Sequence, residues 1–542
     1  MNSILQVPKP YNEPILSYTK GSKEKKEIKA KLAEMQKEVI EIPLMIGGKE
    51  VKTGNMGEIR IPHDHKHIIA KYHKAGKKEI EMAAKAAREA KGDWDNMPFG
   101  QRAAIFLKAA ELLAGPMRAT LNASTMLGQS KNVFQAEIDA VCELADFFRF
   151  NTYYAEEIYK QQPSSPNGTW NYMDYRPLEG FVFAATPFNF TSIAGNLPSA
   201  PAIMGNTVLW KPASTAVHSA YYLMKLFKSA GLPDGVINML PGSGSKVGGP
   251  VLDHKDFAGI HFTGSTPVFK SMWASAVKNL DNYKSYPRIV GETGGKDFIF
   301  AHASANPEAL KTAIVRGAFE YQGQKCSAAS RAYIPKSLWA EIKDDLVAQV
   351  KTIKMGAVDD FTNAMNAVID EAAFDNIKTY IRCAEEADDA KIIVGGKCDK
   401  KEGYFIEPTI IETSSPDFRT MQEEIFGPVM TIYPYDDNKF EETLKICDET
   451  SPYALTGAVI SQDRQAIIKA MKELRNAAGN FYINDKPTGA VVGQQPFGGA
   501  RGSGTNDKAG SMLNLIRWVS PRTVKETFVP ATNYRYPFME DE

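Results

Sequence analysis

The sequence predicts an α/β protein whose core is built on parallel sheets. Four short apolar runs follow one another between residues 181 and 265, and helix-compatible stretches such as 216–230 separate them. The runs are FVFAATP (181–187), TVLWKP (207–212), VINMLPG (236–242) and GIHFTGS (259–265). Buried strands that alternate with helices are typical of βαβ units with parallel strands. Ligands bind at the carboxyl ends of such strands, where Asn189, Lys211 and Ser265 stand.

A second α/β unit is predicted to start near Arg288. It begins with RIVGETGGKDFIFA, and a helix over 307–321 and the strand SRAYIPK follow. Further apolar runs lie at 403–411, 427–435 and 455–460. The chain therefore contains more than one sheet, as its length of 542 residues also indicates.

The two ends of the chain have a different character. Residues 21–42 alternate in charge and predict a solvated helix, and residues 78–160 carry apolar stripes at helical spacing. The segment 511–542 is rich in aromatic residues and proline, so we expect an extended tail or strand that docks within the monomer or on a partner subunit.

The composition argues against several classes of partner. Lys+Arg and Asp+Glu both number 64, so the formal net charge is zero. A general nucleic-acid binder or a binder of anionic membranes needs a basic excess. No run of 18 apolar residues is present, so we expect no membrane span.

The five cysteines form no C-x-x-C pair, which disfavours a disulfide framework or a structural zinc site and favours a reducing compartment. Residues 1–18 show neither a signal peptide nor a transit peptide pattern. We expect a cytoplasmic protein, with the mitochondrial matrix as the alternative if a presequence has been removed.

Cys326 is the first candidate for chemistry. A lone cysteine is more often a small buried hydrophobe than a nucleophile. Here it follows a turn, Gln322-Gly323-Gln324, and precedes small residues, which leaves space around the sulfur. A free thiol with a pKa of roughly 8.5 needs help to become a thiolate at neutral pH.

Three further motifs stand at predicted strand ends. Glu292 precedes two glycines and can face a cleft, although a solvated loop residue is the simpler interpretation. Asn189 can donate its amide to an oxyanion or cap the following helix. FTGST (262–266) combines a strand, a glycine turn and a helix start, which suits a phosphate group, but no standard Rossmann fingerprint or P-loop is present.

A histidine pattern is set aside. His63, His65 and His67 alternate in HDHKH, which on a strand places three imidazoles on one face. No other ligands stand nearby in the sequence, so a solvated strand edge is the better interpretation and no metal site is predicted.

Seven motifs in order carry a family resemblance. They are PFNF, LWKP, FTGS, GETGGK, GQKC, EEIFGPV and PFGG. From about residue 45 to residue 525 the chain resembles the aldehyde dehydrogenase superfamily. That resemblance implies two open α/β domains, one Rossmann-like for the cofactor and one catalytic, plus a small β-hairpin for oligomerisation. The implied bounds are 1–160 with 180–288 for the cofactor domain, 289–510 for the catalytic domain, and 161–179 with 511–542 for the oligomerisation part.

The resemblance also implies roles for single residues. Cys326 matches the nucleophile, Glu292 the general base, and Asn189 the oxyanion donor, together with the backbone N–H of Cys326. The residues that match the cofactor site are Thr186, Lys211, Ser214, Gly264, Ser265, Glu424 and Phe426. NAD is the expected cofactor. Many NAD-preferring members carry Glu where this chain has Ser214, so weaker use of NADP is also expected.

The chain resembles one branch of this superfamily more closely than the others. EGFVFAATPFNFTSIAGNLPSAPAIMGN, GQKCSAASR and PTGAVVGQQPFGGARGSGTNDKAG are similar to the Δ1-pyrroline-5-carboxylate dehydrogenases, which implies oxidation of glutamate γ-semialdehyde to glutamate through a thioester. The residues that match the substrate site are Glu143, Phe190, Ser327, Gly489, Ala490 and Phe497. Some members have Ser at the position of Ala490, so one side-chain hydrogen bond to the substrate carboxylate is absent here.

The expected partners are a small-molecule substrate and further copies of the chain. The sequence disfavours two other functions. An acylating enzyme that transfers the acyl group to coenzyme A typically lacks the base that Glu292 matches. A catalytically silent structural protein is disfavoured because Cys326 and Glu292 are both present.

Overall fold

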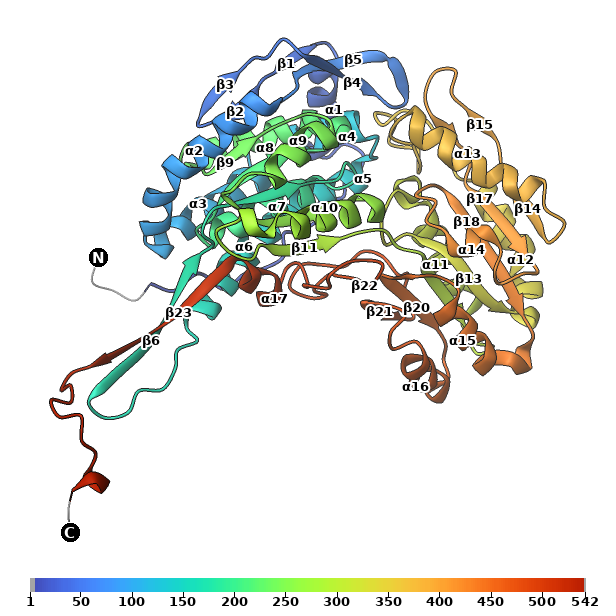
Figure 1. The fold of residues 1–542 in the computed structure, drawn as a ribbon. Coiled ribbons are helices and arrows are strands. Elements are labelled where there is room, and N and C mark those ends of the chain that lie inside the picture. Colours follow the sequence, from blue (N-terminus) through green and yellow to red (C-terminus); the bar gives the residue numbers. More distant parts are fainter. Residues whose placement is uncertain (1–4, 541–542) are drawn as a thin grey trace.

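The computed structural model describes residues 5–540 and contains two large α/β units (Figure 1). The first unit is built on a seven-stranded sheet of order β11-β10-β7-β8-β9-β2-β3. Its strands are β2 (Leu44–Ile46), β3 (Lys49–Val51), β7 (Phe181–Ala185), β8 (Thr207–Lys211), β9 (Ile237–Met239), β10 (Phe257–Thr263) and β11 (Arg288–Glu292). The strands from β11 to β9 run parallel, and β2 and β3 form an antiparallel edge.

Helices cover both faces of this sheet. The helices of this unit are α2 (Lys77–Asn96), α3 (Phe99–Ala114), α4 (Arg118–Gln129), α5 (Val133–Ala136), α6 (Leu144–Tyr159), α7 (Thr191–Ile203), α8 (Val217–Ala230), α9 (Gly244–Leu252) and α10 (Thr266–Lys278), with a π-helical segment, η1 (Glu137–Glu143), between α5 and α6. Alternate residues of β7 and β8 point to opposite sides, so Val182 and Trp210 join a core with α3, α6, α7 and α8, whereas Phe183 and Leu209 join a core with α2, α9 and α10.

The second unit has a seven-stranded sheet of order β14-β17-β18-β13-β12-β20-β21. Its strands are β12 (Asp297–Ala301), β13 (Ala329–Pro335), β14 (Ala390–Val394), β17 (Thr409–Thr413), β18 (Val429–Tyr435), β20 (Thr456–Ile460) and β21 (Asn480–Ile483). All neighbours are parallel except β14 and β17. The helices are α11 (Pro307–Phe319), α12 (Lys336–Lys351), α13 (Glu371–Glu385), α14 (Arg419–Gln422), α15 (Phe440–Glu449) and α16 (Arg464–Glu473).

Smaller elements complete the molecule. Helix α1 (Lys23–Met35) is followed by the sheet β1-β5-β4, made of Ile40–Ile42, Asp64–His73 and Met56–Ile61. Two short pairs lie in the second unit: β15 (Cys398–Asp399) with β16 (Phe405–Ile406), and β19 (Tyr453–Ala454) with β22 (Ala500–Arg501). Strands β6 (Thr169–Pro177) and β23 (Val519–Thr527) form an antiparallel hairpin that projects from the first unit (Figure 1).

The junction between the two sheets positions the site. Strand β11 ends the parallel part of the first sheet at Glu292, and β12 opens the second sheet at Asp297. Few residues separate the two strands, so Glu292 stands between the two units. The 3₁₀ turn η4 (Glu320–Gly323) links α11 to β13 and leads directly to Cys326.

The predicted strands of the first sheet are confirmed, as are the helices that begin near 217 and 307. The start of the second unit near Arg288 is wrong, because Arg288–Glu292 pairs with β10 in the first sheet. The predicted helix over 21–42 is too long, since α1 ends at Met35 and residues 40–42 pair with β5. In the predicted tail, α17 (Met512–Leu515) packs against α6, and β23 pairs with β6, while residues 541–542 lie outside the described part of the chain.

Candidate active site

Cys326 stands at the end of a strained turn. Tyr321, Gln322 and Gly323 have φ of 52°, 56° and 65°, three successive left-handed residues. A Cβ on Gly323 would lie 2.2 Å from the carbonyl oxygen of Gly427, so only glycine fits there. The side chain of Gln322 donates to the carbonyls of Ser130 (3.0 Å) and Ala367 (2.8 Å), which holds the turn in place. Strain fixed by its surroundings in this way is common beside reacting groups.

The thiol of Cys326 is half-buried and is not paired with a cation. Burial raises its pKa well above the usual range, and the negative charge of Glu292 adds to this. The resting sulfur is therefore a thiol, and its activation needs a base nearby.

Glu292 has the properties of such a base. It ends β11 and lines the same cavity as Cys326, and one of its carboxylate oxygens lies 3.3 Å from the place that a Cβ on Gly498 would take. Burial raises the pKa of this carboxyl to about 8. A general base is most effective when its pKa lies near the working pH.

Asn189 is aimed at the nucleophile's turn and does not cap a helix. Its Nδ2 donates to the carbonyl of Gln324, two residues before Cys326, at 3.1 Å. The cap of α7 is supplied from elsewhere, because the carboxylate of Asp139 accepts from the backbone N–H of Thr191 (3.0 Å) and of Ser192 (2.9 Å). The second N–H of the Asn189 amide remains available for an oxyanion.

One cavity of ≈ 870 Å³ brings together the predicted nucleophile, the predicted base and the predicted substrate residues. The predicted residues that line it are Cys326, Glu292, Glu143, Phe190, Ser327, Gly489, Ala490 and Phe497. They come from both units and from sequence positions more than 300 residues apart. The volume suits a small aldehyde.

The segment around Gly489 and Ala490 is tied to the residue beside the nucleophile. Ser327 and Thr488 share a hydrogen bond between their hydroxyls at 2.8 Å. The ammonium of Lys486 donates to the carbonyl of Thr488 at 3.1 Å. Gly489 has a φ of 99°, so the chain turns sharply at this point. A loop with a nearby ammonium and free backbone amides suits a carboxylate.

Glu143 lies at the other side of the cavity, where the π-helix η1 meets α6. The hydroxyl of Ser192 lies 2.8 Å from its carboxylate. Burial, and then the charge of Asp139, raise the pKa of Glu143 to about 8. Single π-helical turns are frequent at functional sites because they redirect a side chain. The neighbouring ring of Phe190 has the ammonium of Lys131 4.3 Å from its centroid.

The predicted cofactor residues lie apart from this cavity, at the carboxyl edge of the first sheet. Ala185 pairs with Lys211 and Phe262 pairs with Ala185, so the ends of β8, β7 and β10 are level. Thr186 follows β7, and its hydroxyl accepts from Trp210 Nε1 at 3.0 Å. Gly264 and Ser265 precede α10, which begins at Thr266. A backbone turn at a helix start is a suitable place for a phosphate group.

Two observations test whether this edge fits a dinucleotide. Burial alone lowers the pKa of Lys211 to about 8, and none of the ion pairs among residues 5–540 includes it, so its ammonium is free to bind ligand hydroxyls. Ser214, whose Oγ lies 3.4 Å from the carbonyl of Gly242, places no charge nearby. These residues fit a ribose.

The second unit contributes Glu424 and Phe426 to the same region. Glu424 accepts from the backbone N–H of Gly295 at 3.1 Å, and burial raises its pKa to about 7. A Cβ on Gly294 would lie 2.1 Å from this carboxylate, so the glycine leaves room for it. Phe426 packs against Phe188 with ring centroids 5.8 Å apart, and Phe188 belongs to the segment after β7. The edge of the first sheet and the loop after α14 thus face each other.

A thiol and a carboxyl line one cavity, an amide donor bonds to the turn before the cysteine, and a separate strand edge fits a ribose. These are the groups that a pyridine-nucleotide-dependent aldehyde oxidation needs. Residues 51–524 match the model of the aldehyde dehydrogenase family. The chain belongs to the aldehyde dehydrogenase family. The fold is accordingly the aldehyde dehydrogenase fold, as the seven motifs predicted.

Several similar proteins share the name Delta-1-pyrroline-5-carboxylate dehydrogenase. The mitochondrial Delta-1-pyrroline-5-carboxylate dehydrogenase of Dictyostelium discoideum is 57% identical over 538 residues, which cover 99% of this chain and 96% of the relative. The mitochondrial protein of the same name from Homo sapiens is 48% identical over 530 residues, covering 98% and 94%. The crystal structure of the Mycobacterium tuberculosis Delta-pyrroline-5-carboxylate dehydrogenase bound with NAD has a TM-score of 0.97 at 52% identity and covers 100% of both chains.

The described part of this aldehyde dehydrogenase has neither a membrane-spanning helix nor a metal-ligand cluster. No helix in the described range 5–540 is long and apolar enough to cross a membrane. Within the same range, no group of three or more His, Cys, Asp or Glu side chains is arranged to hold a metal ion. Of the three histidines in HDHKH, His63 is buried, and His65 stacks on Tyr404 with ring centroids 5.0 Å apart.

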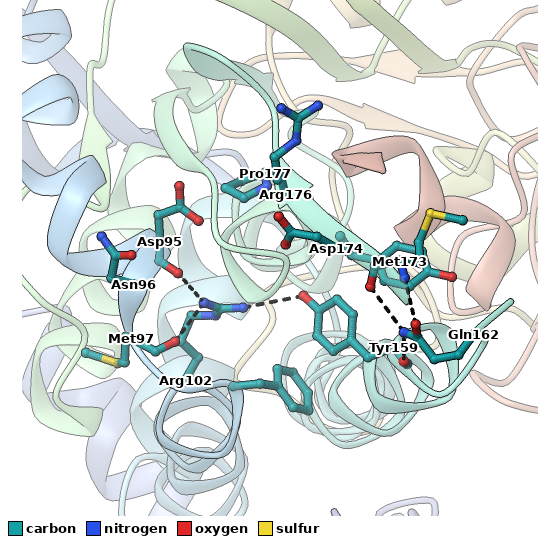
Figure 2. Close-up of a pocket in the computed structure, with 12 residues that line it drawn as sticks. Asp95, Asn96, Met97, Arg102, Tyr159, Gln162, Met173, Asp174, Arg176 and Pro177 are labelled. Atoms are coloured by element: carbon teal, nitrogen blue, oxygen red, sulfur yellow. Dashed lines mark hydrogen bonds between the residues drawn. The ribbon is translucent and has the colours of Figure 1, made fainter. Parts of the chain in front are cut away.

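A second cavity, of ≈ 490 Å³, lies at the base of the hairpin (Figure 2). The guanidinium of Arg102 donates to the carbonyls of Asp95 (3.2 Å) and Met97 (2.9 Å) and to the hydroxyl of Tyr159 (3.4 Å). None of the predicted catalytic, cofactor or substrate residues lines this cavity, and the bonds of Arg102 join α3 to the end of α2 and to α6.

Sequence reasoning missed several residues of the main cavity. Thr488 stands directly before Gly489 and Lys486 three residues before it, and a polar residue next to a turn glycine was the available signal. Asn12, Glu13 and Ile15 also line the cavity, although they precede the family match that begins at residue 51. No local pattern in the sequence points to this second group.

Proposed function

We propose that the chain oxidises L-glutamate γ-semialdehyde, the open form of Δ1-pyrroline-5-carboxylate, to L-glutamate and reduces NAD⁺, the second step of proline catabolism. One observation carries the proposal: the thiol of Cys326, the carboxyl of Glu292 and the Gly489–Ala490 loop line a single cavity. The names of the relatives support the substrate, and the NAD-bound neighbour supports the cofactor.

The first chemical step forms a bond between sulfur and carbon. Glu292 takes the proton of the Cys326 thiol, which is needed because burial raises the pKa of that thiol. The thiolate attacks the aldehyde carbon, and the carbonyl oxygen becomes an oxyanion. The Nδ2–H of Asn189 and the backbone N–H of Cys326 stabilise that charge.

The cofactor residues serve the oxidation. Lys211 would bind the adenosine ribose, and the turn at Gly264 and Ser265 would receive the pyrophosphate. Glu424 and Phe426 would hold the nicotinamide-side ribose and ring, and Thr186 would line the cofactor. Bound NAD⁺ would accept the hydride that leaves the former aldehyde carbon, and the acyl group would remain on Cys326 as a thioester. Use of NADP at lower efficiency follows from Ser214, which does not repel a 2′-phosphate.

The last step is hydrolysis. Glu292 first releases the thiol proton to solvent and, once ionised again, removes a proton from a water molecule, whose oxygen attacks the thioester carbon. The C–S bond breaks, the acid leaves, and Cys326 recovers its proton. An acylating enzyme would use coenzyme A in place of this water, and the half-buried carboxyl of Glu292 in the cavity favours hydrolysis.

The substrate is held at both ends. Ser327 and the backbone of Gly489 and Ala490 receive the α-carboxylate, and Glu143 receives the α-amino group. Phe190 and Phe497 enclose the aliphatic chain between them. This arrangement places the aldehyde at Cys326 only for a substrate of the right length.

The larger organisation is also part of the proposal. The first unit, predicted as 1–160 with 180–288, binds the cofactor, and the second, predicted as 289–510, supplies the nucleophile. The hairpin at 161–179 with 511–542 serves a homo-oligomer, a dimer or larger. The cytoplasm is the proposed compartment, with the mitochondrial matrix as the alternative that the names of the relatives favour.

An aldehyde panel tests the function. NADH formation is followed at saturating NAD⁺ with glutamate γ-semialdehyde and with pentanal, which has the same chain length and no charged groups. We expect kcat/KM to be at least about tenfold higher for the semialdehyde, since hydrogen bonds to charged groups contribute about 1.5–3 kcal/mol each. A preference for pentanal would contradict the substrate and leave the family assignment in place.

A further inference from the structure

The chain before α1 is bound tightly to the body of the protein. Residues 5–18, here called the N-terminal arm, contain no helix or strand, yet a buried carboxylate holds them. Glu137 accepts from the backbone N–H of Leu16 at 3.0 Å and from the hydroxyl of Tyr18 at 2.7 Å. A buried carboxylate needs several donors, and the arm supplies two of them.

Glu13 anchors the middle of the arm. Its carboxylate lies 2.9 Å from Arg118 and 2.9 Å from Arg149, and its backbone N–H donates to Asp146 at 2.7 Å. The guanidinium of Arg149 also lies 4.2 Å from the ring centroid of Tyr11. Glu13 is only 10% exposed, so removing the arm would leave two largely buried arginines without this partner.

The arm reaches the substrate cavity. Asn12, Glu13 and Ile15 line the same cavity as Cys326 and Glu143. The arm therefore forms part of the wall that a substrate meets.

Asn12 joins the arm to the loop that follows Gly489. Its Nδ2 donates to the carbonyl of Val492 at 2.8 Å and to the carboxylate of Asp146 at 2.8 Å. Its Oδ1 accepts from Nε2 of Gln494 at 2.9 Å. Both N–H groups and the oxygen of this amide are thus used, and two of the three bonds go to the loop.

The loop needs hydrogen bonds of this kind to stay ordered. Gly489 and Gly493 have φ of 99° and 82°, and glycine loses the most conformational freedom when it is ordered. A Cβ on Gly493 would lie 2.1 Å from the ring of Phe150, so the glycine is required for the loop to approach α6. The same residue that allows this approach also makes the loop flexible.

We propose that the N-terminal arm is a specificity element of the active site, in which Asn12 is a positioning residue that holds the 489–494 loop ready for the substrate carboxylate. The inference rests on the proposed function, because it assigns the loop to the carboxylate. A loop fixed in advance costs less ordering when the substrate binds. Loss of the hydrogen bonds between Asn12 and the loop therefore weakens the binding of a carboxylate-bearing aldehyde and leaves the binding of an uncharged aldehyde unchanged.

The test uses the full chain and two variants that cut the link from opposite sides. Asn12→Ala removes the arm side chain that makes both hydrogen bonds to the loop. Gln494→Ala removes one of these two bonds from the loop side, where the glutamine side chain is exposed. KM and kcat are measured with glutamate γ-semialdehyde and with pentanal. Lys9→Ala, an exposed arm residue, is the matched control.

In Asn12→Ala we expect KM for the semialdehyde to rise about tenfold, in line with two lost hydrogen bonds. The kcat for the semialdehyde and both constants for pentanal should stay within about twofold. Gln494→Ala should give a smaller rise of the same kind, and Lys9→Ala no change. If Asn12→Ala folds poorly, the Gln494→Ala result decides alone.

Two outcomes overturn the proposal. Equal changes for both substrates would show that the arm matters only for general stability. An unchanged KM in both variants would show that the loop is ordered without Asn12. A wild-type protein that does not prefer the semialdehyde over pentanal would contradict the proposed function itself. The inference about the arm would then also be wrong.

Discussion

The hydroxyl of Ser327 lies 2.8 Å from the hydroxyl of Thr488, and this contact joins the residue after the nucleophile to the loop of Gly489. A substrate whose carboxylate binds this loop is therefore placed relative to Cys326 through two adjacent hydroxyl groups. The geometry of attack and the recognition of the far end of the substrate are coupled at this point.

Thr488→Val tests that coupling. Valine keeps the shape of threonine and removes the hydroxyl that contacts Ser327, so Ser327 loses its fixed orientation. We expect kcat/KM for glutamate γ-semialdehyde to fall about fivefold to twentyfold, which corresponds to about 1–2 kcal/mol. Ser327→Ala should reduce the difference in kcat/KM between the semialdehyde and pentanal. An equal loss for pentanal in either variant would contradict a role specific to the carboxylate.

Cys326→Ala should abolish turnover and preserve cofactor binding. The thiol is the proposed nucleophile, whereas the cofactor residues Lys211 and Glu424 belong to other elements. Single-turnover assays should detect no NADH, and fluorescence titration should give an NAD⁺ dissociation constant close to that of the wild type. Cys383→Ala, a half-buried cysteine on α13, is the control and should keep full activity. Normal turnover in Cys326→Ala would disprove covalent catalysis.

Glu292→Gln should separate acylation from hydrolysis. The amide cannot remove a proton from water, so the thioester accumulates once it has formed. Rapid-quench experiments should show a burst of NADH of about one equivalent per active site, slower than in the wild type because Glu292 also takes the thiol proton, followed by a still slower steady state. If no burst appears, acylation depends on Glu292 more than hydrolysis does.

The pH dependence follows from the raised pKa of Glu292. Its ionised form is the base, and a pKa of about 8 means that the active fraction grows as the pH rises through that value. Where hydrolysis limits turnover, kcat should therefore increase about tenfold per pH unit below 7 and level off above about 9. A pH profile of kcat measures this, and the ionisation should be missing in Glu292→Gln. A flat wild-type profile between pH 6 and 9 would contradict the assignment.

Lys131→Met should lower the stability of the folded protein. The ammonium of Lys131 is fully buried, lies 2.7 Å from the carboxylate of Asp139, and stands 4.5 Å from the ring centroid of Tyr321. Removing one partner of a buried ion pair costs about 3–5 kcal/mol, and we expect the lower value because Asp139 keeps the donors of Thr191 and Ser192.

A thermal melt of Lys131→Met measures the effect as a lower Tm. The control is Lys354→Met, which removes an exposed pair with Asp360 at 2.8 Å and should change stability by less than about 1 kcal/mol. Equal melting temperatures for the two variants would show that the buried pair contributes little.

The parts of the molecule that the sequence predicts are those with a local signal. The runs that became β7, β8, β9 and β10 are short, apolar and bounded by turns, so their strand character is visible without any partner. Cys326, Glu292 and Asn189 stand in motifs that a family resemblance identifies one by one. Each of these inferences needs only a few neighbouring residues.

What the sequence does not predict depends on distant partners. Strand β11 has a readable pattern, but its pairing with β10 decides that it belongs to the first sheet. The contact of Asn12 with Val492 spans 480 positions, and the cap that Asp139 provides for Thr191 spans 52. No periodicity marks such pairs, because only the folded chain brings them together.

Ser214→Glu should increase the preference of the protein for NAD⁺ over NADP. Ser214 is uncharged, lies three residues after Lys211, which ends β8, and begins the 3₁₀ turn that follows this strand. A carboxylate at this position accepts a hydrogen bond from a ribose 2′-hydroxyl and repels a 2′-phosphate. We expect kcat/KM with NADP to fall by at least about tenfold, which corresponds to about 1.4 kcal/mol of charge repulsion, while the value with NAD⁺ changes by less than about threefold. Ser214→Gln is the matched control, because it adds a side chain of the same size without charge. If the glutamine and glutamate variants lose NADP activity equally, size and not charge limits the 2′-phosphate, and the neutral Ser214 is not the reason for NADP use.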